Sequence, residues 1–447
     1  GAKVKAGRDV TVSAKDTTLA INANGAGAGG GAAGVAGSLG VTLLHDSAEA
    51  GVRNGAKVDA GRVLSVQAET EETVVNVGVT GYGGGAAGVG GSAAVNVVTS
   101  TTSAFIGDAD INQAATTSTE RSVEVTADSN SNLIAVAGSG GGAGAAAVGG
   151  VLNVNTLAKK TTALIGEGAT VAADDNVIVD ATSAQNIISA GISIQGAGAA
   201  AVGGAATVNV VANTTEAYIG SARDDATKTA AAVDSDGNVV VAASDDTLLI
   251  AVAGSGTGAG AAAVGGAVGA NVISSQTRAY VGDNSVVNAR GNSAGTTVAT
   301  GTTDNAAAGA MPSLPSGVSS AVDADRDGTN DGNIGNGASF TLAGGGTSTG
   351  VNPSSIKDSG GSSVGSALGG IGAKGTETAK GLSVTATGNE KIVSAAIGVA
   401  GAGAAGVTGA GLATLAGRLQ AFRPDLVNGV GVIVGIDRFM SEGRTVT

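Results

Sequence analysis

The sequence predicts an all-β protein, a parallel β-solenoid built from six imperfect copies of one repeat with one long insertion. Three observations favour this fold. Glycine accounts for 79 of the 447 residues, and both Gly and Val disfavour helix interiors. Hydrophobic residues make up 43% of the chain and charged residues 13%, which is too apolar a balance for a disordered protein. One unit recurs, with spacings of about 54 to 62 residues between the first five copies.

The repeat is marked by a short strand of the pattern V/L-x-V-x-A, seen first in VTVSA at positions 10–14. Its apolar residues alternate at period two, which is typical of a half-buried strand. The central valines of the six copies are Val12, Val66, Val125, Val179, Val241 and Val384. A second apolar run follows nine residues later, at Ile21, Val75, Ile134, Ile188, Ile250 and Val393.

The length of the repeat varies in only one place. A Gly/Ala tract follows the second apolar run. In five copies the pattern A-x-I/V ends the unit about forty residues after the central valine, and in four of them Gly comes next. All differences in length fall after that point. An insertion costs little in an exposed loop, whereas one added residue within a strand turns its side chains to the wrong face. We therefore expect the body of each copy to pack against its neighbours and the tail to form a loop.

A polar residue recurs thirty positions after each central valine, and the six residues are Thr42, Asn96, Asn155, Asn209, Asn271 and Thr414. Residues in one column of a solenoid can form a stacked hydrogen-bonded ladder, and the alternative is that they mark turns. The Gly and Ala residues of the tracts are expected to face inward and to let the two walls of the solenoid approach closely. Strand-like runs recur about every ten residues, so we expect each 54-residue repeat to form three coils of 18 residues. At 4.8 Å per coil, the whole chain would then form a rod about 100 Å long.

Transmembrane helices are a weaker alternative. Residues 187–212 carry no charge, and the tracts contain small residues at helical spacing. However, Asn and Thr interrupt them, and their flanks are acidic rather than basic.

The net charge of −13 and the low aromatic content argue against nucleic-acid binding. The chain contains no Cys, which suits an exported protein. Because it opens in the middle of a repeat, we expect a fragment of a longer array.

Three regions are predicted: repeats one to five in 1–290, a Gly/Ser/Pro-rich insertion in 291–380, and a sixth, degenerate repeat in 381–447. The insertion contains the run DADRDGTNDGN, in which carboxylates alternate before a glycine. This spacing is typical of loops that surround Ca²⁺ with oxygen ligands, and it resembles thrombospondin type 3-like repeats and the first half of an EF-hand loop. It lacks the final Glu of the EF-hand. We expect a structural calcium site, or alternatively a solvated acidic turn, formed by Asp323, Asp325, Asp327, Asp331 and Asn333.

Residues suited to catalysis are few. His45 is the only histidine and is expected to lie at the surface or at a strand end, so a Ser-His-Asp arrangement has one available base. Zinc and thiol chemistry are disfavoured by the absence of Cys. Lys159–Lys160 and the acidic pairs 174–175 and 224–225 are expected to lie in solvated turns or loops.

The repeat unit, with its V-x-V-x-A strand, GGAGAAAVGG tract, V-N-V run and T-x-A-x-I-G ending, resembles the repeats of large bacterial filamentous adhesins and leukotoxin-type exoproteins. The clearest matches are residues 123–171 and 239–281, and the resemblance covers most of the chain outside 290–380 and the last twenty residues. It implies a right-handed parallel β-helix, export by two-partner secretion or autotransport through an outer-membrane transporter, and a place at the bacterial cell surface or in the medium.

The resulting hypothesis is a non-catalytic, extracellular structural or adhesive rod that takes part in cell adhesion or biofilm formation. Its partner would be a host or bacterial surface receptor or a matrix glycan. One alternative is a self-assembling fibre or matrix protein whose copies associate end to end. The other is a β-helix enzyme that cleaves polysaccharides.

Overall fold

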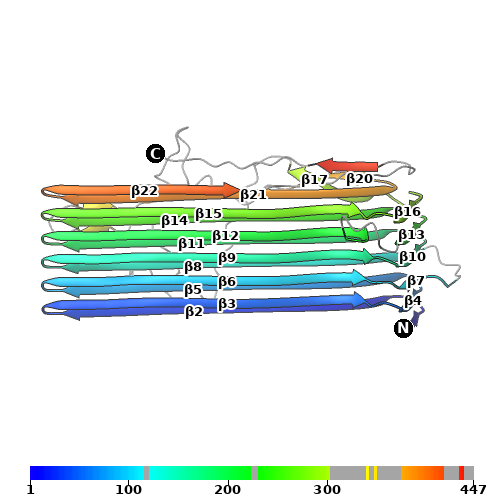
Figure 1. Cartoon of the computed structure of the whole chain (residues 1–447), viewed down its shortest axis with the longest axis horizontal. Helices are drawn as coiled ribbons and strands as arrows, with labels where there is room; N and C mark the ends of the chain where they lie inside the picture. Colours follow the sequence, from blue (N-terminus) through cyan, green and yellow to red (C-terminus); the bar gives the residue numbers. More distant parts are fainter. Residues whose placement is uncertain are drawn as a thin grey trace.

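The computed structural model describes residues 1–114, 120–222, 230–302, 339–341, 347–349, 374–416 and 432–436. All regular structure in these residues is strand, and none of it is helix. The strands form three parallel sheets that run the length of one stack of rungs, as Figure 1 shows. The predicted all-β parallel solenoid of repeats is therefore confirmed.

Each rung consists of two long strands that lie over one another, joined by a two-residue arch, and a short strand on the opposite edge (Figure 1). Sheet B holds the first long strands: β2 (Val10–Gly30), β5 (Val63–Gly84), β8 (Ser122–Ala143), β11 (Val177–Ala197), β14 (Val239–Ala259) and β21 (Leu382–Ala402), followed by β23 (Val432–Ile436). Sheet C holds the returning strands: β3 (Ala33–Val52), β6 (Ala87–Ile106), β9 (Ala146–Gly166), β12 (Ala200–Gly220), β15 (Ala262–Val281) and β22 (Ala405–Ala416). Sheet A holds the short strands: β1 (Lys3–Ala6), β4 (Lys57–Ala60), β7 (Asp110–Ile111), β10 (Thr170–Ala173), β13 (Ala232–Ser235) and β16 (Val286–Ala289).

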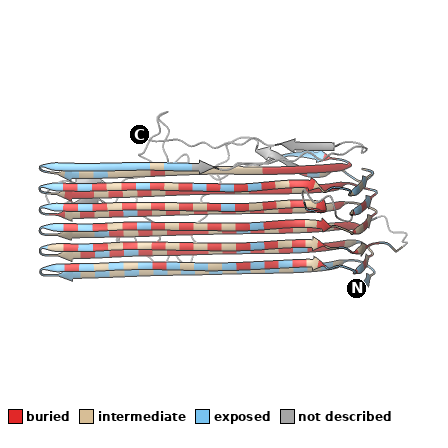
Figure 2. Cartoon of the chain, in the orientation of Figure 1, coloured by how far each residue is buried: buried red, intermediate tan, exposed pale blue. Residues whose placement is uncertain are grey.

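The register of sheet B confirms the columns read from the sequence. Val12 pairs with Val66, and the pairing continues through Val125, Val179, Val241 and Val384. These valines face inward and, together with the isoleucines that end the sheet C strands, form the largest apolar part of the core. Val66 and Ile106 are fully buried. Figure 2 shows buried residues alternating with less buried ones along the long strands of the inner rungs, as period two requires.

The predicted three coils per repeat were wrong, because one repeat makes one rung. Ser38 and Ser92, which occupy the same position on adjacent rungs, are 54 residues apart. A strand of 21 residues spans about 70 Å, whereas six rungs stack to about 29 Å, so the longest dimension runs along the strands (Figure 1). Most Gly residues of the tracts lie inside continuous long strands.

The arches explain why Gly stands at one position in every copy. Backbone bonds stack the arches, for example from the amide of Gly85 to the carbonyl of Gly30. A Cβ atom on Gly85 would overlap the carbonyl oxygen of Gly31, and a Cβ on Gly144 that of Gly85. Only Gly allows this approach of backbone to backbone. The six arches are Gly31–Ala32, Gly85–Ala86, Gly144–Ala145, Gly198–Ala199, Gly260–Ala261 and Gly403–Ala404.

Inward-facing Gly residues inside the strands make room for larger side chains on the facing sheet. A Cβ on Gly90 or Gly141 would overlap the buried ring of Tyr82, and one on Gly149 or Gly203 would overlap Gln195. The prediction that small inward residues let the two walls approach closely is confirmed at these positions.

The transmembrane-helix alternative is wrong, because 187–212 forms parts of β11 and β12. In the part of the chain that the structure describes, no helix is long and apolar enough to cross a membrane.

The sixth rung joins the stack directly, although it is distant in sequence. β21 pairs in parallel with β14 along its whole length. Before it, β17 (Thr296–Thr302) and β20 (Lys374–Ala379) form an antiparallel pair in which Thr302 lies opposite Lys374. Val298 and Ala379 of this pair pack on Val240 of β14. A second antiparallel pair is formed by β18 (Ser339–Thr341) and β19 (Thr347–Thr349).

Candidate functional site

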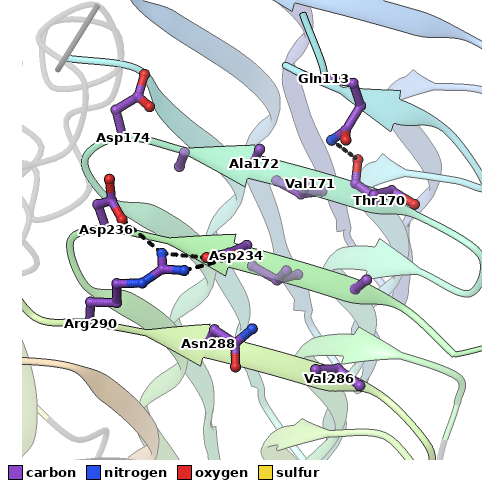
Figure 3. Close-up of a pocket in the computed structure, with 13 residues that line it drawn as sticks. Gln113, Thr170, Val171, Ala172, Asp174, Asp234, Asp236, Val286, Asn288 and Arg290 are labelled. Atoms are coloured by element: carbon purple, nitrogen blue, oxygen red, sulfur yellow. Dashed lines mark hydrogen bonds and ion pairs between the residues drawn. The ribbon is translucent and has the colours of Figure 1, made fainter. Parts of the chain in front are cut away.

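A pocket of about 400 Å³ lies over the short sheet A, on strands β10, β13 and β16 (Figure 3). Side chains two residues apart on one strand share a face, and pairing places equivalent residues of neighbouring strands side by side. Ala172 therefore lies beside Asp234, which lies beside Asn288. Gln113 stands at the β10 side, where its amide donates to the carbonyl oxygen of Thr170 at 3.2 Å.

Arg290 holds the two carboxylates at the other side of the pocket. Its guanidinium donates to Asp234 at 2.5 and 3.2 Å and to Asp236 at 2.7 Å (Figure 3). The hydrogen bond to Asp234 raises the pKa of Arg290, so the group remains a cation. All three side chains are about half exposed, and the ion pairs therefore contribute little to stability. Their effect is to orient polar groups at the surface.

Asp174, the third carboxylate of the pocket, is held more firmly. Arg121 binds it through two parallel hydrogen bonds of 2.5 and 3.1 Å, and the Arg121 side chain is only 10% exposed. The same guanidinium donates to the carbonyl oxygens of Asn112 and Ala114 at 3.0 and 3.1 Å. This network ties the turn after β10 to the turn after β7, so the wall of the pocket is preorganised.

The pocket combines fixed carboxylate acceptors with guanidinium and amide donors over a floor that includes Ala172. Among the described lining residues there is no histidine or cysteine. The carboxylates of Asp234 and Asp236 are both paired with the guanidinium of Arg290. Such a surface suits hydrogen bonding to a neutral, hydroxyl-rich ligand, and its excess of carboxylates disfavours anions.

A second polar region runs through the interior between the two long sheets. Lys159, on β9, is 4% exposed, and its ammonium group donates to the carbonyl oxygens of Ser129 and Ala184 at 2.9 and 3.2 Å. Our expectation that Lys159 lies in a solvated turn or loop was therefore wrong, because it faces inward on a long strand. Burial lowers the pKa of Lys159 to about 8, and the nearby carboxylates Glu72 and Asp245 oppose that shift.

The carboxyl groups of this interior region also titrate abnormally. Burial raises the pKa of Glu390 to about 7 and raises that of Asp245, which accepts a hydrogen bond of 2.6 Å from Gln185. Burial raises the pKa of Asp46 as well, with a further contribution from Glu72. The region is too enclosed to serve a large substrate, and we assign it a structural role.

The Asn column forms the ladder that was one of two interpretations of the sequence. Each side-chain amide donates to the amide oxygen on the next rung, from Asn96 to Asn155 at 2.7 Å, on to Asn209 at 2.8 Å and on to Asn271 at 2.8 Å. Asn76 of sheet B donates to Asn96 at 2.8 Å. All five residues are buried. The ladder thus satisfies most of their polar groups within the stack, and Oδ1 of Asn76 is left without a partner among the described residues.

The predicted calcium ligands Asp323, Asp325, Asp327, Asp331 and Asn333 lie outside the described residues, as does the acidic pair 224–225. In the described ranges, no three His, Cys, Asp or Glu side chains are grouped to hold a metal ion. His45 is exposed on β3, as expected, and its Nδ1 lies 2.8 Å from the hydroxyl of Thr99.

Sequence reasoning missed the pocket and the role of the pair 174–175. Asp174 and Asp175 lie in a turn as expected, but both are hydrogen bonded, Asp175 accepting from Ser122 at 3.1 Å. A signal for the pocket existed, because Arg290 follows Asp236 by one repeat length of 54 residues. Opposite charges one repeat apart become neighbours in a parallel stack.

The fold and the in-register columns define this protein as a parallel β-solenoid of wide, three-strand rungs. Comparisons with protein-family models, with curated proteins and with solved structures find no match to the chain.

Proposed function

We propose that the protein is a non-catalytic structural and adhesive segment of a large bacterial protein, displayed at the cell surface or released from it. The observation that carries the proposal is the unbroken stack of six rungs in one register, because such a stack supplies stiffness and spacing without an active site. The sequence resemblance to filamentous adhesins and leukotoxin-type exoproteins supports this location and implies passage through an outer-membrane transporter.

The adhesive contact is assigned to the edge that carries sheet A. The described residues that flank the segments of varying length, such as Ala114 and Ala222, lie next to the short strands of sheet A, and none of these segments interrupts the long strands. Loops carried by a rigid scaffold are common binding positions. The pocket of Asp174, Asp234, Asp236 and Arg290 is on the same edge. We therefore propose that its ligand is a neutral glycan of a host, bacterial or matrix surface.

Binding of the purified chain to an array of neutral and anionic glycans tests this proposal. Arg290→Ala releases two carboxylates and removes a donor, so we expect at least a tenfold loss of binding to the neutral glycans. Arg53→Ala is the matched control, because Arg53 is also an exposed arginine paired with a carboxylate, Glu49, outside the pocket. Equal effects of the two changes, or no binding to any glycan, would contradict the adhesive role.

Calcium binding by Asp323, Asp325 and Asp327 remains a proposal, and it can be tested together with the independence of the stack. Because Thr302 lies opposite Lys374, an Asn-Gly turn can replace residues 303–373. We expect this variant to keep the β-sheet circular dichroism of the full chain and to lose the binding of Ca²⁺ measured by titration calorimetry. Loss of the β signal would show that the rungs depend on the insertion, and retained Ca²⁺ binding would place the site elsewhere.

A self-assembling fibre is the second candidate, and the in-register stacking of equivalent strands favours it. Each rung adds to its neighbour through parallel strand pairing, and the same pairing between copies would extend the stack. Electron microscopy of dilute samples separates single particles from filaments that grow end to end.

A further inference from the structure

The half of each rung next to the arch carries no charged residue. We define the arch half by residues 19–44, 73–98, 132–157, 186–211 and 248–273, which lack Asp, Glu, Lys, Arg and His. The corresponding part of the sixth rung, 391–416, begins with Lys391 and is otherwise uncharged. Because the rungs are in register, the charge-free parts align into one continuous block.

The outer side of sheet C within this block is almost purely apolar. We call it the apolar face, and it consists of the outward residues of 33–43, 87–97, 146–156, 200–210, 262–272 and 405–413. Of these side chains only Thr156 is polar, and none is buried. One column is valine on every rung, from 70% exposed at the first to 43% at the fourth: Val35, Val89, Val148, Val202, Val264 and Val407.

A column of glycines lies two residues from the valine column, at Gly37, Gly91, Gly150, Gly204, Gly266 and Gly409. The valines form a ridge along the stack, and the glycines form a groove beside it. In a face-to-face pair of copies, the valine ridge of one face would pack into the glycine groove of the other.

The interior behind the apolar face is more polar than its exterior. Asn96, Asn155 and Asn209 face inward there, as do Gln195 and Ser193 of the facing sheet. An ordinary half-exposed sheet has the opposite arrangement, with apolar residues inward and polar residues toward water. This inversion indicates that water is not the final environment of the apolar face.

The size of the apolar face matches a protein interface. It extends about 36 Å along the strands and about 29 Å along the stack, which gives an area of about 1,000 Å². A typical monomer has a largest apolar patch of about 300–600 Å². A stable protein interface covers about 800 Å² on each partner. A second copy that places its own apolar face here supplies enough area for a stable dimer.

A lipid bilayer is the alternative occupant of the apolar face, and the vesicle experiment below distinguishes it from a second copy. The area of the face matches what a stable dimer needs, and its valine ridge and glycine groove repeat on every rung. These two features favour a second copy of the chain. We propose that two copies of this chain pair through the apolar faces of their C sheets.

The pairing rests on this face alone and does not depend on the proposed adhesive function. Its test is the mass of the full chain in solution, measured by analytical ultracentrifugation over micromolar concentrations. We expect a species of twice 41.5 kDa. The double variant Val89→Lys and Val202→Lys places charges on the second and fourth rungs, and we expect it to weaken dimerisation at least a hundredfold while the circular dichroism stays unchanged.

Two single variants are the matched controls. Thr101→Lys adds a charge to the polar part of the same sheet face, and Ile192→Lys adds one to the outer face of sheet B. Both are expected to keep the dimer. A monomeric wild type, a dimer that survives the double variant, or a dimer lost with Ile192→Lys overturns the proposal.

Flotation with phosphatidylcholine vesicles completes the test, and we expect the chain to stay in the aqueous fraction. Vesicle binding that the double variant abolishes would assign the face to lipid and overturn the proposal. If the lysine variant does not fold, Val89→Ser and Val202→Ser together provide an uncharged disruption of the same face, with a smaller loss of dimerisation expected.

Discussion

The two halves of each rung solve the same folding problem in different ways. Next to sheet A, the long strands bury Val, Ile and Ala between them and direct polar or charged residues such as Glu216 and Lys160 outward. In the arch half, Val202 is outside and Asn209 is inside. Parallel pairing keeps one register through both halves. The contrast shows that backbone pairing and the columns of equivalent residues define the solenoid. The apolar side chains can face inward at one end of a strand and outward at the other end.

The largest expected difference in the free energy of unfolding is between a lysine placed inside the half next to sheet A and a lysine placed on the outer side of the arch half. Val125→Lys puts an ammonium group into the fully buried valine column, where burial of an unpaired charge is expected to cost more than about 4 kcal/mol and to abolish cooperative unfolding. Val202→Lys, on the exposed side of the arch half, is expected to change the free energy of unfolding by less than about 0.5 kcal/mol. Denaturation in urea at low protein concentration measures both. A similar loss in the two variants would mean that the apolar face is part of the folding core.

A smaller effect is expected in the interior of the arch half. Asn155→Ala removes the hydrogen bonds to Asn96 and Asn209 and leaves buried amide groups unpaired, so we expect a loss of about 2–4 kcal/mol in the free energy of unfolding. Asn130→Ala is the control, because Asn130 faces outward and its side-chain amide donates to Asp128 on the same strand at 3.2 Å. Urea unfolding of the two variants side by side tests whether the ladder stabilises the stack. Equal stabilities would show that it does not.

The smallest effect is a pH dependence from the boundary between the halves. The pKa of Lys159 is about 8 in the folded protein and near its usual 10.5 in the unfolded chain, so between these values the unfolded state binds more protons. Stability should therefore rise from pH 8 to pH 10, by up to about 3 kcal/mol. The penalty for burying the ammonium group is present in full below pH 8.

Unfolding measured across this range checks the assignment to Lys159. Lys159→Met should lose the rise, and Lys160→Met should keep it, because Lys160 lies next in sequence but faces outward. A rise that persists in Lys159→Met would place the titrating group elsewhere.

Much of the architecture could be predicted because the repeats constrain one another. The constant offsets of Val125 and Asn155 from copy to copy indicated columns, and parallel stacking follows directly from columns. The rung size could not be predicted in the same way. Strands in globular proteins average five or six residues, so a Gly tract suggests a break, whereas stacked neighbours here hold residues such as Gly138 in a strand of 22 residues.

The candidate sites were harder to predict, for two separate reasons. Lys159 lies four residues after Asn155 and therefore faces the same side of the strand, so the alternation could have placed it inside. A pair of Lys residues is, however, typical of an exposed surface. The pocket depends on short strands of sheet A whose spacing from the long strands varies between copies, so Asp234 and Arg290 meet only after the register is known.

The width of the rungs has a mechanical consequence. Tension that pulls the first rung away from the sixth acts along the hydrogen bonds and detaches one rung after another. A released rung of 54 residues frees up to about 190 Å of chain, although it occupied about 4.8 Å of the stack. Under load, such a protein would lengthen in large discrete steps and absorb work at each one, so it would behave as an extensible tether.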